Sequence, residues 1–389
     1  MEKTTDCFII DKVDAVLPNG IEKGVSIQVE EGRIVSIGSI SSRTVPVIDG
    51  KGCLLLPGMF DIHSDALETT IEPRPGAVFP IDVAIYEMDK RLLASGVTTI
   101  FHCVAFVEAA TGKRSLRSNK VAENIARQII GLTPELRVNT RIHGRYDLIN
   151  APAAPILCDF IENEQIHLVS FMDHTPGQGQ FRDIEAFVRL NEKRTGASAE
   201  ELEKHVRTRQ AARDAIDTAA LDAVIALCHR FDVPMASHDD DSRELVQNWK
   251  KKGIRISEFP VNAEALETAH QEKIDTSLGA PNICRGQSLS GNLSARDAIE
   301  SGYGDIICSD YSPMALLPAV FLLVQEGLKP LHEAVNMVSL NPAQAVGESA
   351  ERGSLEAGKI ADLILVSLEN DVPLVRQTFV HGKLVYAYN

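Results

Sequence analysis

Two short segments of the chain carry metal-binding side chains at the end of an apolar run. The first, LPGMFDIHSD at residues 56–65, ends with His63 and Asp65, and the second, ICSDY at residues 307–311, contains Asp310. Residues two apart in an extended chain point to the same side, so His63 and Asp65 can face one ligand. Imidazole and carboxylate groups together suit Zn²⁺, Mn²⁺ or Fe²⁺. Both runs therefore predict buried strands that end at a metal site.

Three further histidines follow strand-like runs: His143, His174 and His238. Each has a plainer interpretation as a structural, hydrogen-bonded residue, and Asp173 is an alternative ligand beside His174. Glu258 also ends a strand-like run, and its role stays open. The predicted ligands of one or two divalent ions, with Zn²⁺ expected first and Mn²⁺ or Fe²⁺ as alternatives, are His63, Asp65, His143, His174, His238 and Asp310.

The middle of the chain must contain the elements that position these side chains. Helical and strand-like patterns alternate there. This alternation predicts parallel strands joined by helices, an α/β fold. In a (β/α)8 TIM barrel the C-terminal ends of all strands meet at one face, so ligands far apart in sequence would converge there. We expect the barrel over residues 56–348 and its strands near 56–63, 97–105, 137–143, 166–173, 233–238, 254–259, 275–284 and 305–310.

Both ends of the chain have a different pattern. Residues 7–38 alternate apolar and polar side chains and contain turn signals at Pro18-Asn19-Gly20 and Glu31-Gly32, which is typical of short antiparallel strands. The segment from Gly358 onward shows the same alternation of apolar and polar residues. Because neither end is long enough for a sound core alone, residues 1–55 and 349–389 are predicted to form one small β-sandwich domain together.

Composition narrows the function classes. With 389 residues and 44% hydrophobic content, the chain can hold one large domain and a small one. A net charge of −15 without a basic stripe argues against a nucleic-acid surface, and no apolar stretch approaches the roughly 20 residues that cross a membrane. The seven scattered cysteines predict a cytoplasmic protein. The start, MEKTTDC at residues 1–7, agrees with this because it lacks a basic segment followed by an apolar one. A homo-oligomer is left open.

These motifs resemble those of the amidohydrolase superfamily. The LPGMFDIHSD segment looks like its first-strand motif, with His-x-Asp in place of the more frequent His-x-His. The chain is similar to one branch, the phosphonate-metabolism diphosphatases of the carbon-phosphorus lyase pathway. The further matching motifs are EPRPG at 72–76, FMDHTPGQ at 171–178, SHDD at 237–240, SEFPV at 257–261 and SDY at 309–311.

The resemblance implies a metal-dependent hydrolase that converts α-D-ribose 1-methylphosphonate 5-triphosphate, a small phosphorylated sugar, to the 5-phosphate and pyrophosphate. It implies that Asp310 binds metal and takes the proton of the attacking water, which makes it the catalytic residue. The alternative reaction is C-N bond cleavage in a small cyclic or N-acyl substrate by an amidohydrolase or deaminase. The arginines expected to bind the substrate phosphates are Arg74, Arg145, Arg182 and Arg285.

Three positions differ from the pattern of this branch. Ala66, Phe79 and Asp147 stand where Asn, Trp and Glu are usual, and the third substitution leaves open whether Asp147 reaches a metal. A third interpretation is a non-catalytic barrel that has lost its ligands. The presence of His63 and His238 argues against that interpretation.

Overall fold

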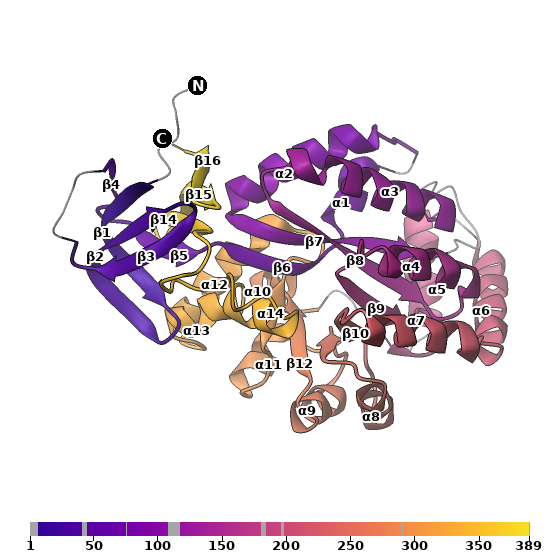
Figure 1. The fold of residues 1–389 in the computed structure, drawn as a ribbon. Coiled ribbons are helices and arrows are strands. Elements are labelled where there is room, and N and C mark those ends of the chain that lie inside the picture. Colours follow the sequence, from indigo (N-terminus) through magenta and orange to yellow (C-terminus); the bar gives the residue numbers. More distant parts are fainter. Residues whose placement is uncertain are drawn as a thin grey trace.

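The structure is a computed structural model that describes residues 7–40, 45–74, 76–107, 117–179, 184–195, 198–288 and 291–388. It contains two separate eight-stranded sheets, one of them an array of parallel strands surrounded by helices (Figure 1). The other sheet lies at one side of the molecule and contains strands from both ends of the chain (Figure 1). The predicted barrel with a small β domain from both termini is therefore confirmed.

The parallel sheet contains the eight predicted strands in chain order. Its first and last strands are joined through Ser64 and Asp310, which closes the sheet into a barrel. Most residues of these strands are buried, as expected for parallel strands covered on both faces. The strands are β6 (Met59–Ser64), β7 (Val97–Phe106), β8 (Asn139–Asp147), β9 (Leu168–Met172), β10 (Met235–His238), β11 (Ile256–Glu258), β12 (Asp275–Gly279) and β13 (Ile306–Cys308).

Several strands are shorter than predicted, and the largest difference lies at β12. We expected a strand over 275–284, but β12 ends at Gly279 and residues Ala280–Arg285 form helix α10. Pro281 explains the change, because proline suits the first turn of a helix and cannot donate a ladder hydrogen bond within a sheet.

Helices cover the outside of the barrel. In α2 (Ile81–Ser95) the buried residues Ile85, Met88 and Leu92 recur at helical spacing, and the helix ends at Gly96 with a left-handed φ of 84°. The other helices that pack beside the barrel strands or join them are α3 (Asn119–Leu132), α4 (Ala154–Glu162), α7 (Thr218–Arg230), α8 (Arg243–Lys251), α9 (Ala263–Gln271), α11 (Ala295–Glu300), α12 (Leu316–Gln325), α13 (Leu331–Asn336) and α14 (Leu340–Ala345).

A helical pair, α5 (Ile184–Thr195) and α6 (Ala199–Asp214), interrupts the connection between β9 and α7. Helix α6 begins with the capping box predicted from the sequence, in which the Ser198 hydroxyl accepts a hydrogen bond from the Glu201 backbone N-H and the Glu201 carboxylate accepts one from the Ser198 backbone N-H. Arg209 and Arg213 of α6 bind Asp147 and Asp173, at 2.6 Å and 2.7 Å, at the ends of β8 and β9. The pair is thereby tied to the C-terminal face of the barrel.

The second sheet joins the two ends of the chain. Strand β5 (Leu54–Pro57) pairs with β14 (Leu363–Glu369), and the Phe8 and Phe379 rings stack at 5.4 Å in the shared core. Its other strands are β1 (Cys7–Leu17), β2 (Gly20–Glu30), β3 (Arg33–Gly38), β4 (Val47–Asp49), β15 (Val372–Val380) and β16 (Lys383–Ala387). Since β5 leads through Gly58 directly into β6, this sheet holds the start of the first barrel strand in place.

Candidate metal centre

His63, at the end of β6, lies at the centre of the polar cluster. Its Nδ1 is 2.9 Å from Oε1 of Glu258, which ends β11, and both side chains are buried. Burial alone would raise the pKa of Glu258, but His63 and His143 lower it to about 2, so the carboxylate is ionised and accepts from Nδ1 of His63. The Nε2 lone pair of His63 is then free for another partner, and Nε2 has none among the described residues.

His143, on β8, is held in a similar way. Its Nδ1 lies 3.0 Å from the carbonyl oxygen of Ile62, and because a carbonyl only accepts, Nδ1 carries the hydrogen. Burial lowers the pKa of His143 to about 3, so the ring is neutral. Its Nε2 also lacks a hydrogen-bond partner among the described residues. A neutral, oriented imidazole with a free Nε2 is the form that binds metal ions.

Arg145, also on β8, connects Asp65 with His238. Its Nη1 donates to both carboxylate oxygens of Asp65 at 2.7 Å and 2.7 Å, and its Nη2 lies 2.9 Å from Nε2 of His238. Burial alone would raise the pKa of Asp65, but Arg145 holds it well below its ordinary value. On its other side, His238 Nδ1 lies 3.1 Å from Oδ2 of Asp239.

His174 joins the cluster, whereas Asp173 does not. The His174 Nε2 is 3.7 Å from Oδ2 of Asp239, and burial lowers the pKa of His174 to about 3. Asp173 instead accepts hydrogen bonds from Arg213 at 2.7 Å and Gln178 at 3.0 Å. Of the two neighbours that the sequence left as alternatives, only His174 lies beside the other histidines.

Asp310 follows β13 and holds the first and last strands together. Its backbone N-H donates to the carbonyl of His63 at 3.0 Å, and its carbonyl accepts from the backbone N-H of Asp65 at 2.6 Å. The φ of Asp310 is 55°, and Asp239 and Phe259 have similar values of 57° and 54°. Such left-handed residues at strand ends turn the chain sharply over the mouth of the barrel, at a conformational cost of about 1 kcal/mol or more each.

The possible ligand atoms of this cluster fall into four groups, and the atoms of each lie within 4.8 Å of one another. His63 belongs to three of them. These groups also include Glu258, whose role the sequence left open, and Asp239, which was absent from the predicted ligand set. In the sequence, the only signal for these two residues is their position in a motif at the end of a strand. The groups are His63, Cys103 and His143; His63, His238 and Glu258; His174, His238 and Asp239; and His63, Asp65 and Asp310.

The donor set fits a divalent metal ion. Five of its buried atoms have no hydrogen-bond partner among the described residues: His63 Nε2, His143 Nε2, Glu258 Oε2, and the pair His238 Nδ1 and Asp239 Oδ2, which lie 3.1 Å apart. Buried polar atoms without partners are costly, and a bound cation would satisfy the first three of them. Cys103 is the exception, because it faces the protonated Nδ1 of His143 at 3.6 Å and burial raises its pKa well above the ordinary value. Its neutral thiol packs as a small apolar group.

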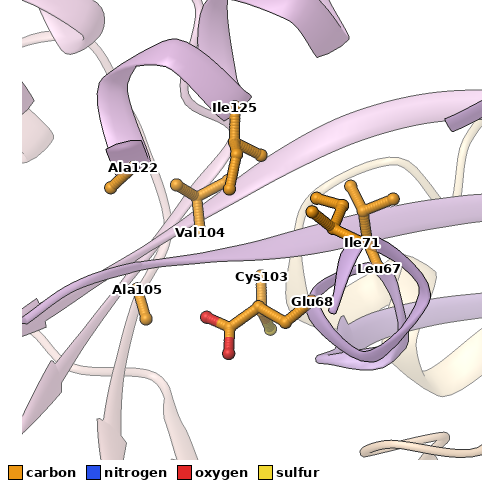
Figure 2. A pocket seen from close by; sticks show the side chains of 8 residues that line it. All are labelled: Leu67, Glu68, Ile71, Cys103, Val104, Ala105, Ala122 and Ile125. Atoms are coloured by element: carbon orange, nitrogen blue, oxygen red, sulfur yellow. The ribbon is translucent and has the colours of Figure 1, made fainter. Parts of the chain in front are cut away.

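A small cavity on the other side of Cys103 does not belong to this cluster. It is lined mostly by apolar side chains of α1 (Ala66–Ile71), β7 and α3 (Figure 2). Among the described residues that line it, the one charged side chain is Glu68, which pairs with Arg117 at 3.3 Å. The candidate metal ligands therefore lie around His63 and not in this cavity.

The other arginines predicted to bind phosphate, and Asp147, lie outside the four ligand groups or outside the described residues. Arg285, at the end of α10, is exposed and donates to the Tyr311 hydroxyl at 2.7 Å, directly beside Asp310 in sequence. Arg74 is exposed on the segment after α1, and Arg182 lies outside the described residues. Asp147 points to Arg209 and belongs to none of the four ligand groups.

Residues 54–385 match the family model described as the amidohydrolase family. The chain belongs to this family. It is 32% identical to the alpha-D-ribose 1-methylphosphonate 5-triphosphate diphosphatase of Escherichia coli (strain K12) over 97% of this chain and 100% of that protein. It is also 21% identical to the dihydroorotase of Aquifex aeolicus (strain VF5), over 89% of this chain and 85% of that protein.

Two solved structures share the fold. N-acetylglucosamine-6-phosphate deacetylase from Pasteurella multocida matches with a TM-score of 0.63 at 15% identity, over 98% of this chain and 100% of that one. Molinate hydrolase matches with a TM-score of 0.66 at 14% identity, over 98% and 95% of the two chains. Among the described residues of this amidohydrolase, no helix is long and apolar enough to cross a membrane.

Proposed function

We propose that this amidohydrolase cleaves α-D-ribose 1-methylphosphonate 5-triphosphate to the 5-phosphate and pyrophosphate in the cytoplasm, as a step of phosphonate catabolism. The observation that carries the proposal is the buried Arg145 guanidinium beside unpaired ligand atoms such as Nε2 of His63. A metal centre next to a fixed cation suits a polyphosphate, whose oxygens need several positive partners. The full-length similarity to the Escherichia coli diphosphatase supports the same substrate.

The proposed ligands of one or two divalent ions are the six predicted residues together with Glu258 and Asp239. Their nitrogen and carboxylate donors suit Zn²⁺ first and Mn²⁺ or Fe²⁺ as alternatives. When bound, such an ion supplies Lewis acidity and lowers the pKa of water towards ~7. The six predicted ligands are His63, Asp65, His143, His174, His238 and Asp310.

Two side chains of the protein have proposed roles in the reaction, one as a base and one as a phosphate ligand. We assign Asp310 as the base that takes the proton of the attacking water, because backbone hydrogen bonds on both sides fix its carboxylate beside His63 and Asp65. Arg145 has five N-H groups, of which Nη1 uses two on Asp65 and Nη2 uses one on His238. Its remaining N-H groups are donors for a phosphoryl oxygen.

The other proposed phosphate contacts are exposed arginines. Arg285 is anchored by Tyr311, the neighbour of Asp310, and is placed to bind a phosphate further from the reacting phosphorus. Arg74 lies on the segment after the first barrel strand, and we keep it and Arg182 as candidate contacts from the sequence. Guanidinium groups bind phosphate oxygens through paired N-H donors.

The test is product identification by phosphorus NMR. Protein loaded with Zn²⁺ is incubated with the ribose methylphosphonate triphosphate, and a chelated sample serves as the control. We expect signals of pyrophosphate and of the 5-phosphate product, and no conversion after chelation. Release of orthophosphate without pyrophosphate, or no conversion by metal-loaded protein, would contradict the proposed reaction.

A further inference from the structure

The guanidinium of Arg145 occupies one half of the metal centre. It donates to both oxygens of Asp65 at 2.7 Å and lies 2.9 Å from Nε2 of His238. Arg145 is only 5% exposed, so these contacts are shielded from solvent. One positive group thus bridges a carboxylate and an imidazole nitrogen, as a metal ion does in such a cluster.

The contact with His238 excludes a metal at the same atom. A guanidinium has donors only, so Nε2 of His238 must supply the lone pair to Arg145. The hydrogen of the neutral ring is then on Nδ1, which faces the Asp239 carboxylate at 3.1 Å. An imidazole nitrogen has a single lone pair, and a metal ion bound at Nε2 would have to displace Arg145. Asp65 differs, because its carboxylate has about four lone-pair sites and can bind Arg145 and a metal together.

In the other half of the centre, no arginine or lysine among the described residues takes such a position. The unpaired buried atoms Nε2 of His63, Nε2 of His143 and Oε2 of Glu258 all lie there. Their lone pairs are available without breaking a contact of Arg145. The half around Arg145 also has buried atoms without a hydrogen-bond partner, but Nε of Arg145 and Nδ1 of His238 are donors, and Oδ2 of Asp239 faces that Nδ1 at 3.1 Å. Within the cluster, the unpaired acceptors that face no donor among the described residues are those around His63.

We propose that Arg145 is a built-in second cation, so that the enzyme binds one metal ion tightly at the half around His63, His143 and Glu258. Arg145 takes the place of a second ion between Asp65 and His238, so that His238 becomes a metal ligand through Nε2 only where Arg145 is displaced or replaced. The inference rests on the metal centre of the proposed function and specifies its stoichiometry. Moving Arg145 away would leave the mostly buried Asp65 carboxylate without its cation, which is unfavourable.

The experiment counts bound metal without any substrate. Wild type, Arg145→Met, Arg145→Gln and Arg145→Lys are stripped with a chelator, titrated with Zn²⁺ by calorimetry, and assayed for zinc per chain after dialysis. We expect one zinc for wild type and Arg145→Lys, and two for Arg145→Met and Arg145→Gln, with second-site affinity rising at least tenfold. Arg209→Met, which removes another buried arginine next to a β8 carboxylate, is the matched control and should keep one zinc.

Two results would overturn the inference: two zinc ions of similar affinity in the wild type, or no gain of a second ion in the folded Arg145 variants. Circular dichroism and thermal unfolding identify which variants fold. If neither neutral variant folds, the wild-type count decides, and an exchange-coupled Mn²⁺ pair in its electron paramagnetic resonance spectrum also contradicts the single tight site. Because no substrate is used, these outcomes are independent of whether pyrophosphate is the product.

Discussion

Oε1 of Glu258 lies 2.9 Å from Nδ1 of His63, and both residues are fully buried at the ends of β11 and β6, which are three strands apart in the closed barrel. A carboxylate bonded to one imidazole nitrogen fixes the tautomer and makes the other nitrogen a better ligand. The same carboxylate has a second oxygen without a partner among the described residues. Glu258 therefore serves the centre in two ways, by holding His63 and by offering a donor of its own.

Replacement of Glu258 tests this relationship. Glu258→Gln keeps the shape of the side chain but removes the negative charge, so Zn²⁺ affinity should fall about 10- to 100-fold. Calorimetric titration of the chelated protein measures the change. Glu348→Gln is the control, because Glu348 pairs with Arg141 at 3.2 Å away from the ligand groups. Equal Zn²⁺ affinity in wild type and Glu258→Gln would rule out both roles.

Metal removal should destabilise the whole protein. Without an ion, the buried Nε2 atoms of His63 and His143 have no partner, whereas bound Zn²⁺ favours the native state by mass action. Zinc at about 1,000 times its Kd should add about 4 kcal/mol to the free energy of unfolding. Thermal unfolding with chelator and with excess Zn²⁺ measures the difference. An unchanged Tm would mean that zinc does not bind the native state.

Arg285 should matter for the substrate and not for the metal. Arg285→Met removes a charge beside Tyr311, and losing one charge-assisted phosphate contact should lower kcat/KM for the triphosphate about ten- to a hundredfold. Zinc content should stay at the wild-type value. Arg127→Met provides a surface control, since Arg127 pairs with Glu123 on the outer helix α3. A loss of zinc in Arg285→Met, or an unchanged kcat/KM, would remove Arg285 from the phosphate site.

Asp275 should make stability depend on pH. Burial, and then the nearby Asp305, raise the pKa of Asp275 to about 6 from its ordinary 3.8. The folded state therefore prefers the protonated acid, and stability is highest below pH ~4 and declines as pH rises through ~6. Asp275→Asn should be about 1–2 kcal/mol more stable than wild type at pH 8, after allowance for the partial exposure of this side chain, and nearly equal at pH 4. Urea unfolding at both pH values checks this, and a pH-independent difference would contradict the assignment.

A buried ion pair should contribute more to stability than an exposed pair in the same region. Arg352 donates to Asp362 at 2.8 Å, and both residues are less than 8% exposed. Arg352→Met should cost about 3–5 kcal/mol, because Asp362 would keep a buried charge without its cation. Arg33→Met removes the exposed pair with Glu351 and should cost less than about 1 kcal/mol. Urea unfolding compares the two, and equal losses would contradict the role of burial.

Local patterns predicted the elements better than the contacts between them. The His63-x-Asp65 spacing and the apolar runs located the barrel strands, because strand burial and side-chain alternation act over a few residues. The bond between His63 and Glu258 joins residues 195 positions apart and exists only once the barrel closes. The bidentate contact of Arg145 with Asp65 likewise depends on side-chain conformations that sequence spacing does not determine. For this reason the sequence pointed to Arg145 as a phosphate ligand without indicating its partners in the protein.

We propose that this metal centre hydrolyses a triphosphate and does not cleave a C-N bond. The most direct test measures kcat/KM for the ribose methylphosphonate triphosphate and for dihydroorotate with the same zinc-loaded preparation. We predict metal-dependent release of pyrophosphate from the triphosphate and no hydrolysis of dihydroorotate above the rate without enzyme. Hydrolysis of dihydroorotate with the larger kcat/KM, and no pyrophosphate from the triphosphate, would contradict the account.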